Sequence, residues 1–502
     1  MKRRIRFSLC FLSLLQIVLI PLHVRAMELL PPAETRFSGK EVAFEKELKE
    51  KKTLDEARLA GYPVVPKTGV PFVPEKERQF EFHILGGMSL ECMYDSRQVI
   101  GAKFNEFVFV PAPQNLDENG CDINAKDQFN MMGVRACCAL HVKGPRVLDA
   151  LTSAVIEGEF NGLDDATVRL FRLERAHANF EWENTRLLLG HYYHPLVLDE
   201  MFPETISRGQ GRAYDPFYRA PQINLRHRFR DFEFVLAIAK VFDSEPARWA
   251  VIPDLFGQVN FHVRDHILGA GINYHVEVPR IFSQIPPKVV ADNLDLDAEE
   301  TYKTIEQVAS IYPFIFAYLD FNPFEVRLRC TYAENASVYD ITGAYAVRFV
   351  NETTDDRLYE NLRTLSTWGD FIYHWGCHAE PALFVGVVKN FGARRNIVKS
   401  YEYVAQNPEE PEEVPLLDVT GSTTSIDYMC ILAPRLRLRF GNFSIGAEVE
   451  YTRASFARPS NKEGWQEDFD DRGRVVRGRP VSNFRLLLAT FYEFEYTPFA
   501  YK

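Results

Sequence analysis

The stretch RLRLRFGNFSIGAEVEY, from Arg435 to Tyr451, alternates charged and apolar side chains on both sides of a Gly-Asn pair. Alternation with a period of two is typical of a β-strand, because successive side chains point to opposite faces of a sheet. A Gly-Asn pair favours a tight turn between antiparallel strands. The stretch therefore predicts a hairpin with an apolar face and a polar face, and the polar face of its first strand carries Arg435, Arg437 and Arg439.

A hairpin of this kind fits two classes of protein. In a soluble β-sandwich, the apolar face packs against a second sheet and the polar face meets water. In an outer-membrane β-barrel, the apolar face meets lipid and the polar face lines an aqueous interior. One hairpin does not separate these two classes, so the rest of the chain has to decide.

Residues 1–26 have the features of a secretory signal peptide. Four basic residues precede the apolar run FSLCFLSLLQIVLI, and the small-residue site VRA ends at Ala26. The run is shorter than the ~20 residues of a spanning helix, which disfavours a single membrane anchor. Cleavage after Ala26 removes five basic and no acidic residues, so the formal charge moves from −11 to −16. Such an acidic exported chain is a poor candidate for binding nucleic acid.

Residues 27–78 form a segment of different composition. Gly39 to Gly61 is rich in charged residues and predicts a short helix, which either pairs with other copies of itself or is surrounded by water. Pro63, Pro66, Pro71 and Pro74 follow and favour an extended linker. We expect residues 27–78 to be a periplasmic extension, helical in its first part and proline-rich in its second.

Residues 79–502 predict a closed antiparallel barrel. Very short connections, such as Gly441-Asn442 and Asn322-Pro323, alternate along the chain with long polar ones. This follows if the short turns lie at one end of an outer-membrane barrel and the long loops at the other. The segment DITGAYAVRFV also looks like a strand, but counting it would reverse the alternation, so we assign 335–366 wholly to a loop. The predicted fold is an all-β, transmembrane, up-and-down barrel of about 16 strands with a short N-terminal helical extension.

Rows of charged residues should face the interior of this barrel, because an arginine at the bilayer midplane costs ~2–4 kcal/mol. Arginine rows favour anions in a pore, and glutamates at 157, 159, 448, 450, 493 and 495 would form an opposing wall. The alternative is that these charges form structural salt bridges that hold loops inside the barrel. The arginines predicted to line the pore are Arg226, Arg228, Arg327, Arg329, Arg435, Arg437, Arg439 and Arg485.

The stretch from Asp199 to Gln222 is rich in glycine, proline, arginine and aromatic residues. A long loop that folds into the lumen narrows it, and Arg208, Arg212 and Arg219 would then meet solutes directly. An ordinary outer loop is the equally supported alternative. The Gly-Gln-Gly at position 209 is not a phosphate-binding loop, because it neither follows an apolar strand nor precedes a helix.

No catalytic, metal or cofactor site is predicted. Seven cysteines remain after cleavage at Ala26, without a Cys-x-x-Cys pair, and most lie in alternating stretches where they serve as small apolar residues. The chain has no His-Glu-x-x-His and no Gly-x-Ser-x-Gly, and His191 and His194 fit an aromatic belt better than a catalytic pair.

The chain resembles the DcaP-like porins of Gram-negative outer membranes. The likeness rests on the order and spacing of six motifs: YDSRQ (Tyr94–Gln98), IEGEFNG (Ile156–Gly162), FRLERAHANFEW (Phe171–Trp182), LLLGHYYHP (Leu187–Pro195), DPFYRAPQI (Asp215–Ile223) and FVGVVKNFG (Phe384–Gly392).

The resemblance implies a homotrimer of 16-stranded barrels, a periplasmic helical extension that matches Gly39 to Gly61, and diffusion of small, mainly anionic solutes such as dicarboxylates. It also implies that Arg172 is a basic pore residue on the fourth strand. Glu174 stands where the family usually has a second basic residue, which weakens the expectation of strong anion selectivity.

The predicted function is a passive porin of the cell outer membrane. Its partners would be outer-membrane lipid, lipopolysaccharide and small anionic solutes, with no nucleic acid, no cofactor and no chemical step. Two alternatives stay open. The first is an adhesive or structural barrel whose pore is blocked by loops, and the second, less favoured, is a barrel enzyme.

Overall fold

The structure is a computed structural model that describes residues 80–496 except 134–135, 163–164, 210, 243, 285–300, 352–353, 377, 404–411, 416–424 and 459–464. The chain divides into two compact units, Met1–Thr68 and Gly69–Lys502, and all described residues belong to the second. The predicted signal peptide and the predicted extension at 27–78 lie outside the described residues and stay predictions. No helix in the described ranges is long and apolar enough to cross a membrane.

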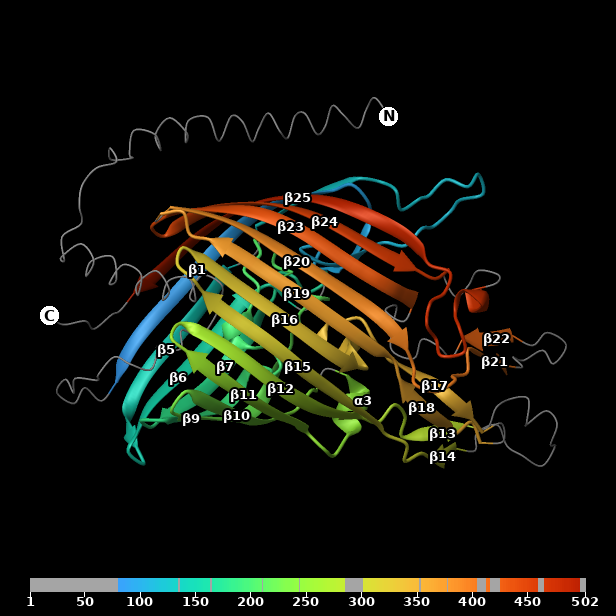
Figure 1. The fold of residues 1–502 in the computed structure, drawn as a ribbon, viewed down its shortest axis with the longest axis horizontal. Coiled ribbons are helices and arrows are strands. Elements are labelled where there is room, and N and C mark those ends of the chain that lie inside the picture. The colour runs from blue at the N-terminus through green and yellow to red at the C-terminus, as the bar shows by residue number, and fades with distance from the viewer. Residues whose placement is uncertain are drawn as a thin grey trace, which may run out of the picture. The chain divides into compact units, whose positions relative to one another are not determined.

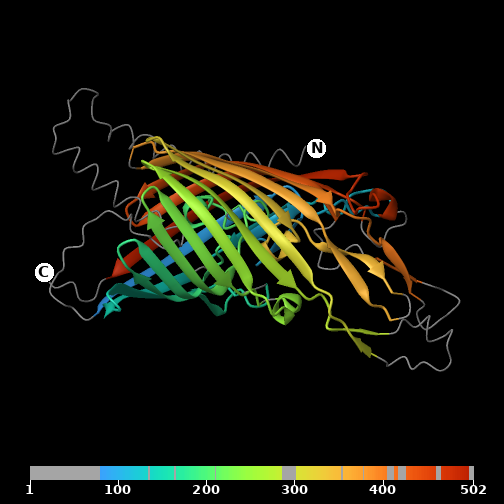
Figure 2. The same cartoon turned by 60° about the horizontal axis from the view of Figure 1, so that its bottom comes forward.

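The second unit is built on one large antiparallel sheet (Figures 1 and 2). Its strands are β1 (Glu81–Asp95), β4 (Gln128–Met132), β5 (Ala136–Val147), β6 (Ala150–Phe160), β7 (Phe171–Glu181), β8 (Thr185–Tyr193), β9 (Arg219–Phe229), β10 (Phe232–Ala239), β11 (Asp254–Val263), β12 (His266–Glu277), β15 (Val308–Asp320), β16 (Phe324–Glu334), β19 (Arg363–Tyr373), β20 (Ala379–Gly392), β23 (Ile426–Phe440), β24 (Phe443–Phe456) and β25 (Arg479–Tyr496).

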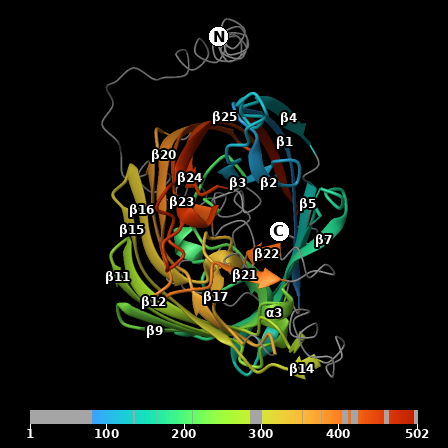
Figure 3. The same cartoon turned by 90° about the vertical axis from the view of Figure 1, so that its right-hand side faces the viewer.

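The sheet closes into a barrel. Each strand pairs with its neighbours in chain order, and β1 pairs with β25 on one side, from Ile84 opposite Tyr496 to Asp95 opposite Arg485. On its other side β1 pairs with both β4 and β5, which follow one another along it and occupy one position. The 17 strands that the described residues contribute therefore make a 16-stranded barrel, which confirms the predicted fold class. Figure 3 shows the ring of strands end on.

Alternation explains why these segments form strands with two different faces. In β10, Leu236 is 62% exposed on the outer face, whereas Val235 is 1% exposed on the inner face. The other strands also carry large exposed apolar residues, so the barrel has an apolar outer surface. Water would make such a surface prone to association, whereas the hydrocarbon of a bilayer matches it.

Smaller elements lie in the long connections at one end of the barrel. Four hairpins outside the barrel sheet are described, together with short helical turns. They are β2 (Val99–Ala102) with β3 (Phe107–Pro111), β13 (Phe282–Gln284) with β14 (Thr301–Lys303), β17 (Tyr345–Val350) with β18 (Arg357–Asn361), β21 (Ser400–Tyr403) with β22 (Glu412–Pro415), α3 (Glu245–Trp249), η1 (Asp199–Met201), η2 (Ala336–Tyr339) and η4 (Trp465–Asp468).

The assignment of 335–366 wholly to a loop is partly wrong. The alternating segment forms β17, which pairs only with β18 in a local hairpin, and the barrel strand β19 begins already at Arg363. The segment is nevertheless outside the barrel sheet, as the alternation of short and long connections requires. An alternation of apolar and polar residues with a period of two predicts a strand, but it does not predict which other strand pairs with it.

Three segments fold into the interior of the barrel: residues 194–218, here named the inward loop, the β2–β3 hairpin, and residues 335–344 with η2. Figure 3 shows β2 and β3 inside the ring of strands. Apolar side chains of all three segments pack with inward-facing barrel residues in one buried cluster, for example Val110, Leu198, Tyr339, Val235 and Phe384. The interior of the barrel is therefore partly a packed apolar core.

Candidate pore constriction

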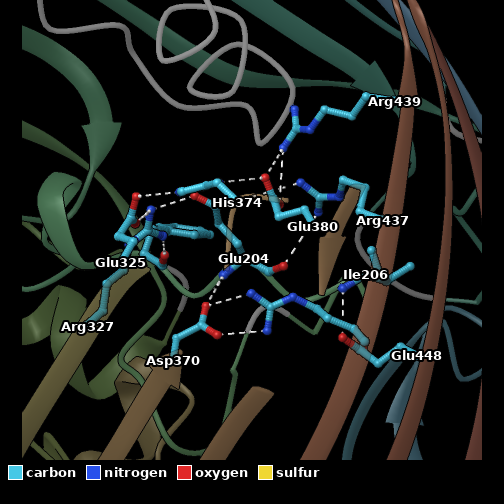
Figure 4. Close-up of polar contacts among 12 residues, drawn as sticks. Glu204, Ile206, Glu325, Arg327, Asp370, His374, Glu380, Arg437, Arg439 and Glu448 are labelled. Atoms are coloured by element: carbon cyan, nitrogen blue, oxygen red, sulfur yellow. Dashed lines mark hydrogen bonds and ion pairs between the residues drawn. The ribbon is translucent and has the colours of Figure 1, made fainter. Parts of the chain in front are cut away.

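The inward loop connects β8 with β9 and is anchored on β19 and β24, which lie several strands away around the ring. Figure 4 shows these anchoring contacts. The backbone N–H of Glu204 donates to Asp370 Oδ2 on β19 at 2.9 Å. The N–H groups of Ile206 and Ser207 donate to the two carboxylate oxygens of Glu448 on β24, at 2.9 and 3.0 Å. Buried backbone N–H groups need partners, and these wall carboxylates supply them. The loop is thus anchored inside the barrel, and its role as a constriction for solutes stays a prediction.

Several arginines predicted to line the pore are buried among these anchors. Arg435 donates to both oxygens of Asp370 at 2.7 and 3.0 Å. Arg329 donates to Asp215 Oδ1 and to the Leu196 carbonyl, both at 2.9 Å, and is therefore bound to both ends of the inward loop. These guanidinium groups form buried ion pairs and hydrogen bonds that hold the inward loop and the barrel wall together. This is the arrangement that the salt-bridge alternative describes.

Arg327, Arg439 and Arg485 are also buried. Arg327 donates to Glu204 at 2.5 Å and Arg439 pairs with Glu380 at 3.3 Å. Arg485 donates to the Asn105 carbonyl in the β2–β3 turn at 2.5 Å. The charges of these three residues are thus directed at protein atoms.

Three further predicted pore residues are partly accessible. Arg226 pairs with Asp199 and Glu200 at the start of the inward loop, at 3.1 and 2.7 Å. Arg437 lies 3.9 Å from Glu204, and Arg228 lies beside the short turn at Arg230. Whether any of them meets a solute stays a prediction.

A second group of arginines lies at the end of the barrel with the long loops. Arg172 is the second residue of β7, Arg219 begins β9, and Arg208 and Arg212 belong to the inward loop. Together with Phe107, Tyr193 and Phe217 they form what we name the arginine–aromatic cluster. The cluster thus contains Arg208, Arg212 and Arg219 of the predicted constriction loop. It also contains Arg172, the pore residue that the resemblance implies.

Aromatic rings fix the orientation of the guanidinium groups in this cluster. Arg212 lies between the rings of Phe107 and Phe217, at 4.4 and 3.9 Å from their centroids. Arg219 lies 4.8 Å from Tyr193 and 5.1 Å from Phe217. Such contacts are attractive and leave the edge of the guanidinium group free to bind other acceptors.

Neighbouring carboxylates compensate part of the positive charge of the arginine–aromatic cluster. Glu174 pairs with Arg172 at 2.5 Å and with Arg219, and Arg208 pairs with Glu106 and Glu159, both at 3.0 Å. Glu174 stands where DcaP-like porins usually have a basic residue. Here it connects Arg172 on β7 with Arg219 on β9.

Arg212 has a weaker partner in Asp340, at 3.6 Å. Burial, together with the neighbouring Arg219, Arg172 and Arg208, lowers the pKa of Arg212 to about 10, so this guanidinium is still charged at neutral pH. It is the arginine of the cluster whose charge is least compensated.

Sequence reasoning missed the contribution of the β2–β3 hairpin. Lys103, Glu106 and Phe107 reach the cluster, although their segment looked like an outer loop. The run of aromatic and β-branched residues in FVFVP was the available signal for β3, but not for its place inside the barrel. No group of three or more His, Cys, Asp or Glu residues within the described ranges could hold a metal ion.

Comparisons with known proteins identify the fold. No protein-family model and no curated protein matches the chain. Among solved structures, the outer membrane channel DcaP of Acinetobacter baumannii matches with 11% identity and a TM-score of 0.57, over 84% of this chain and 100% of that chain. An anion-selective porin from Comamonas acidovorans matches with 9% identity and a TM-score of 0.46, over 83% and 100%.

A trimer form of OmpT from Vibrio cholerae matches with 10% identity and a TM-score of 0.45, over 83% of this chain and 100% of that chain. The match to DcaP shows that this chain has the fold of an outer-membrane channel. In particular, this fold is shared with DcaP, which confirms at the level of the fold the resemblance found in the sequence.

Proposed function

We propose that this protein is an outer-membrane porin that lets small, mainly anionic hydrophilic solutes diffuse passively. The observation that carries the proposal is the arginine–aromatic cluster, placed where the inward loop narrows the barrel. Arg172 and Arg219 keep 22% and 18% of their side-chain surface exposed, so they remain accessible to a passing solute. Fixed positive groups in a narrow aqueous path lower the barrier for anions and raise it for cations.

Exposed apolar outer strands support placement in an outer membrane, in contact with lipid and lipopolysaccharide. The export signal at residues 1–26 and a homotrimeric assembly belong to the same proposal. Native mass spectrometry of the detergent-solubilised protein tests the assembly and should give the mass of three chains.

The proposed anion preference predicts a result in planar bilayers. The triple variant R172Q/R212Q/R219Q should form open channels but lose most of the preference, because three fixed charges leave the narrow part of the path. The reversal potential in a KCl gradient measures this. R264Q, in an exposed turn at the opposite end, is the control and should keep the wild-type value. An unchanged reversal potential in the triple variant would contradict the proposed role of the cluster.

A loop-blocked barrel with an adhesive or structural role is the second candidate, because three segments occupy the interior and share one apolar core. The same bilayer experiment separates the two candidates. Well-folded protein that inserts without any conductance step would favour the blocked barrel, whereas ion-selective steps support the porin.

A further inference from the structure

Lys103 lies at the tip of the β2–β3 hairpin in an unusual backbone conformation. Lys103, Phe104 and Asn105 all have positive φ angles, at 56°, 53° and 63°. Non-glycine residues rarely adopt this region, and three in succession persist only when the surroundings hold them. The surroundings do so, because the Phe104 N–H donates to Asp165 Oδ1 at 2.7 Å, and Arg485 donates to the Asn105 carbonyl at 2.5 Å.

This turn places the Lys103 side chain in the arginine–aromatic cluster. The residue is 4% exposed, and its ammonium group lies 4.8 Å from the centroid of the Phe107 ring. Lys103 takes part in none of the ion pairs found among the described residues, whereas the four arginines of the cluster each pair with a carboxylate. The nearby carboxylates thus already have other partners.

Charged groups from every neighbouring element act on this ammonium group. They are Glu106 in the same turn, Glu159 on β6, Arg172 on β7 and Arg208 in the inward loop. Asp165, before β7, accepts the backbone N–H of the adjacent Phe104. Burial and the two arginines oppose the charge on Lys103, and Glu159 and Glu106 favour it only in part.

We propose that Lys103 sets how strongly the constriction attracts anions, and that it does so reversibly by gaining and losing a proton. This inference rests on the proposed function as a porin. Lys103 acts through its electrostatic field on the path beside Arg172 and not by touching the solute, since it is almost fully buried.

The direction of the effect follows from the protonation of the side chain. Burial, with Arg172 and Arg208 beside it, lowers the pKa of Lys103 to about 7. Below that pH the ammonium form adds one positive charge to the cluster, and above it the neutral amine removes that charge. Anion preference should therefore fall as the pH rises through neutrality.

The test is the anion-to-cation permeability ratio of the whole protein in planar bilayers between pH 5.5 and 8.5. We expect the wild-type ratio to fall by about two- to fivefold over this range, as expected for loss of one unit charge near a hydrated path. K103R should keep the high ratio at every pH, and K103M should keep the low ratio at every pH. K143M is the matched control, since Lys143 is 64% exposed at the opposite end, and it should behave as wild type.

The outcomes separate this inference from the proposed function. Channels that prefer anions equally at all pH values would overturn the role of Lys103 and leave the porin in place. The same holds if K103M keeps the wild-type pH dependence, because another group would then carry it. Absence of anion-selective steps at every pH would overturn the proposed function itself. The wild-type titration needs no substitution, so a ratio that stays constant with pH overturns the role of Lys103 even if a change at the strained turn prevents folding.

Discussion

Single-channel conductance is expected to rise when Glu448 is replaced by alanine. The buried Glu448 carboxylate accepts the backbone N–H groups of Ile206 and Ser207 and thereby fixes the tip of the inward loop. A hydrogen bond of this kind contributes about 0.5–1.5 kcal/mol, so the loss of both removes about 1–3 kcal/mol of anchoring. The tip also packs closely on the wall, because a Cβ at Gly446 would lie 2.5 Å from Ile206 Cδ1. Without the carboxylate we expect the tip to leave the wall and the lumen to widen.

Conductance steps in planar bilayers at fixed salt measure this effect, and the diffusion rate of a neutral sugar into liposomes gives an independent value. E448Q should lie between wild type and E448A, since the amide keeps one acceptor oxygen. E183A is the control, because Glu183 lies exposed in the short turn between β7 and β8. Correctly folded E448A with wild-type conductance would mean that the hydrogen bonds of Asp370 hold the loop without Glu448.

The barrel could be predicted because its signals are local. In β23, Arg435 and Leu436 point to opposite faces because side chains alternate along one strand. The Gly-Asn pair then sets the turn of the hairpin between β23 and β24. The rule that short and long connections alternate then ordered the strands without any knowledge of distant contacts. The rule also kept the segment of β17 out of the barrel sheet, but it did not show that this segment is a strand that pairs locally with β18.

The interior could not be predicted in the same way, because its contacts join residues far apart in the chain. Arg435 and Asp370 are 65 positions apart, and Ile206 and Glu448 are 242 apart. An alternating pattern tells which side chains face inward, but it does not tell whether they meet water, a loop or one another. Strand β10 illustrates this, because its inward residues Val235 and Ala237 are apolar and belong to the same buried cluster as Leu198 of the inward loop.

Asp254 accepts hydrogen bonds from three different segments, and no sequence pattern predicted these contacts. His194, at the start of the inward loop, donates from Nε2 to Asp254 Oδ2 at 2.9 Å, since its Nδ1 accepts the Leu196 N–H at 3.2 Å. His275 on β12 donates from Nδ1 to Oδ1 at 2.7 Å, and the hydroxyl of Tyr339 in η2 donates to Oδ2. One buried carboxylate on β11 thus connects the barrel wall with two of the segments that fill it.

Replacing Asp254 by alanine is therefore expected to destabilise the barrel by about 3–5 kcal/mol, because three buried donors lose their acceptor together. D254N should cost less, since the amide oxygen still accepts hydrogen bonds, but its NH₂ group faces a second donor. Urea-induced unfolding in liposomes, followed by tryptophan fluorescence, gives the free energy of unfolding. D265A, in an exposed turn, is the control and should change it little. If D254A unfolded at the wild-type urea concentration, the packing of Tyr339 and Leu196 alone would be sufficient to hold the two segments inside the barrel.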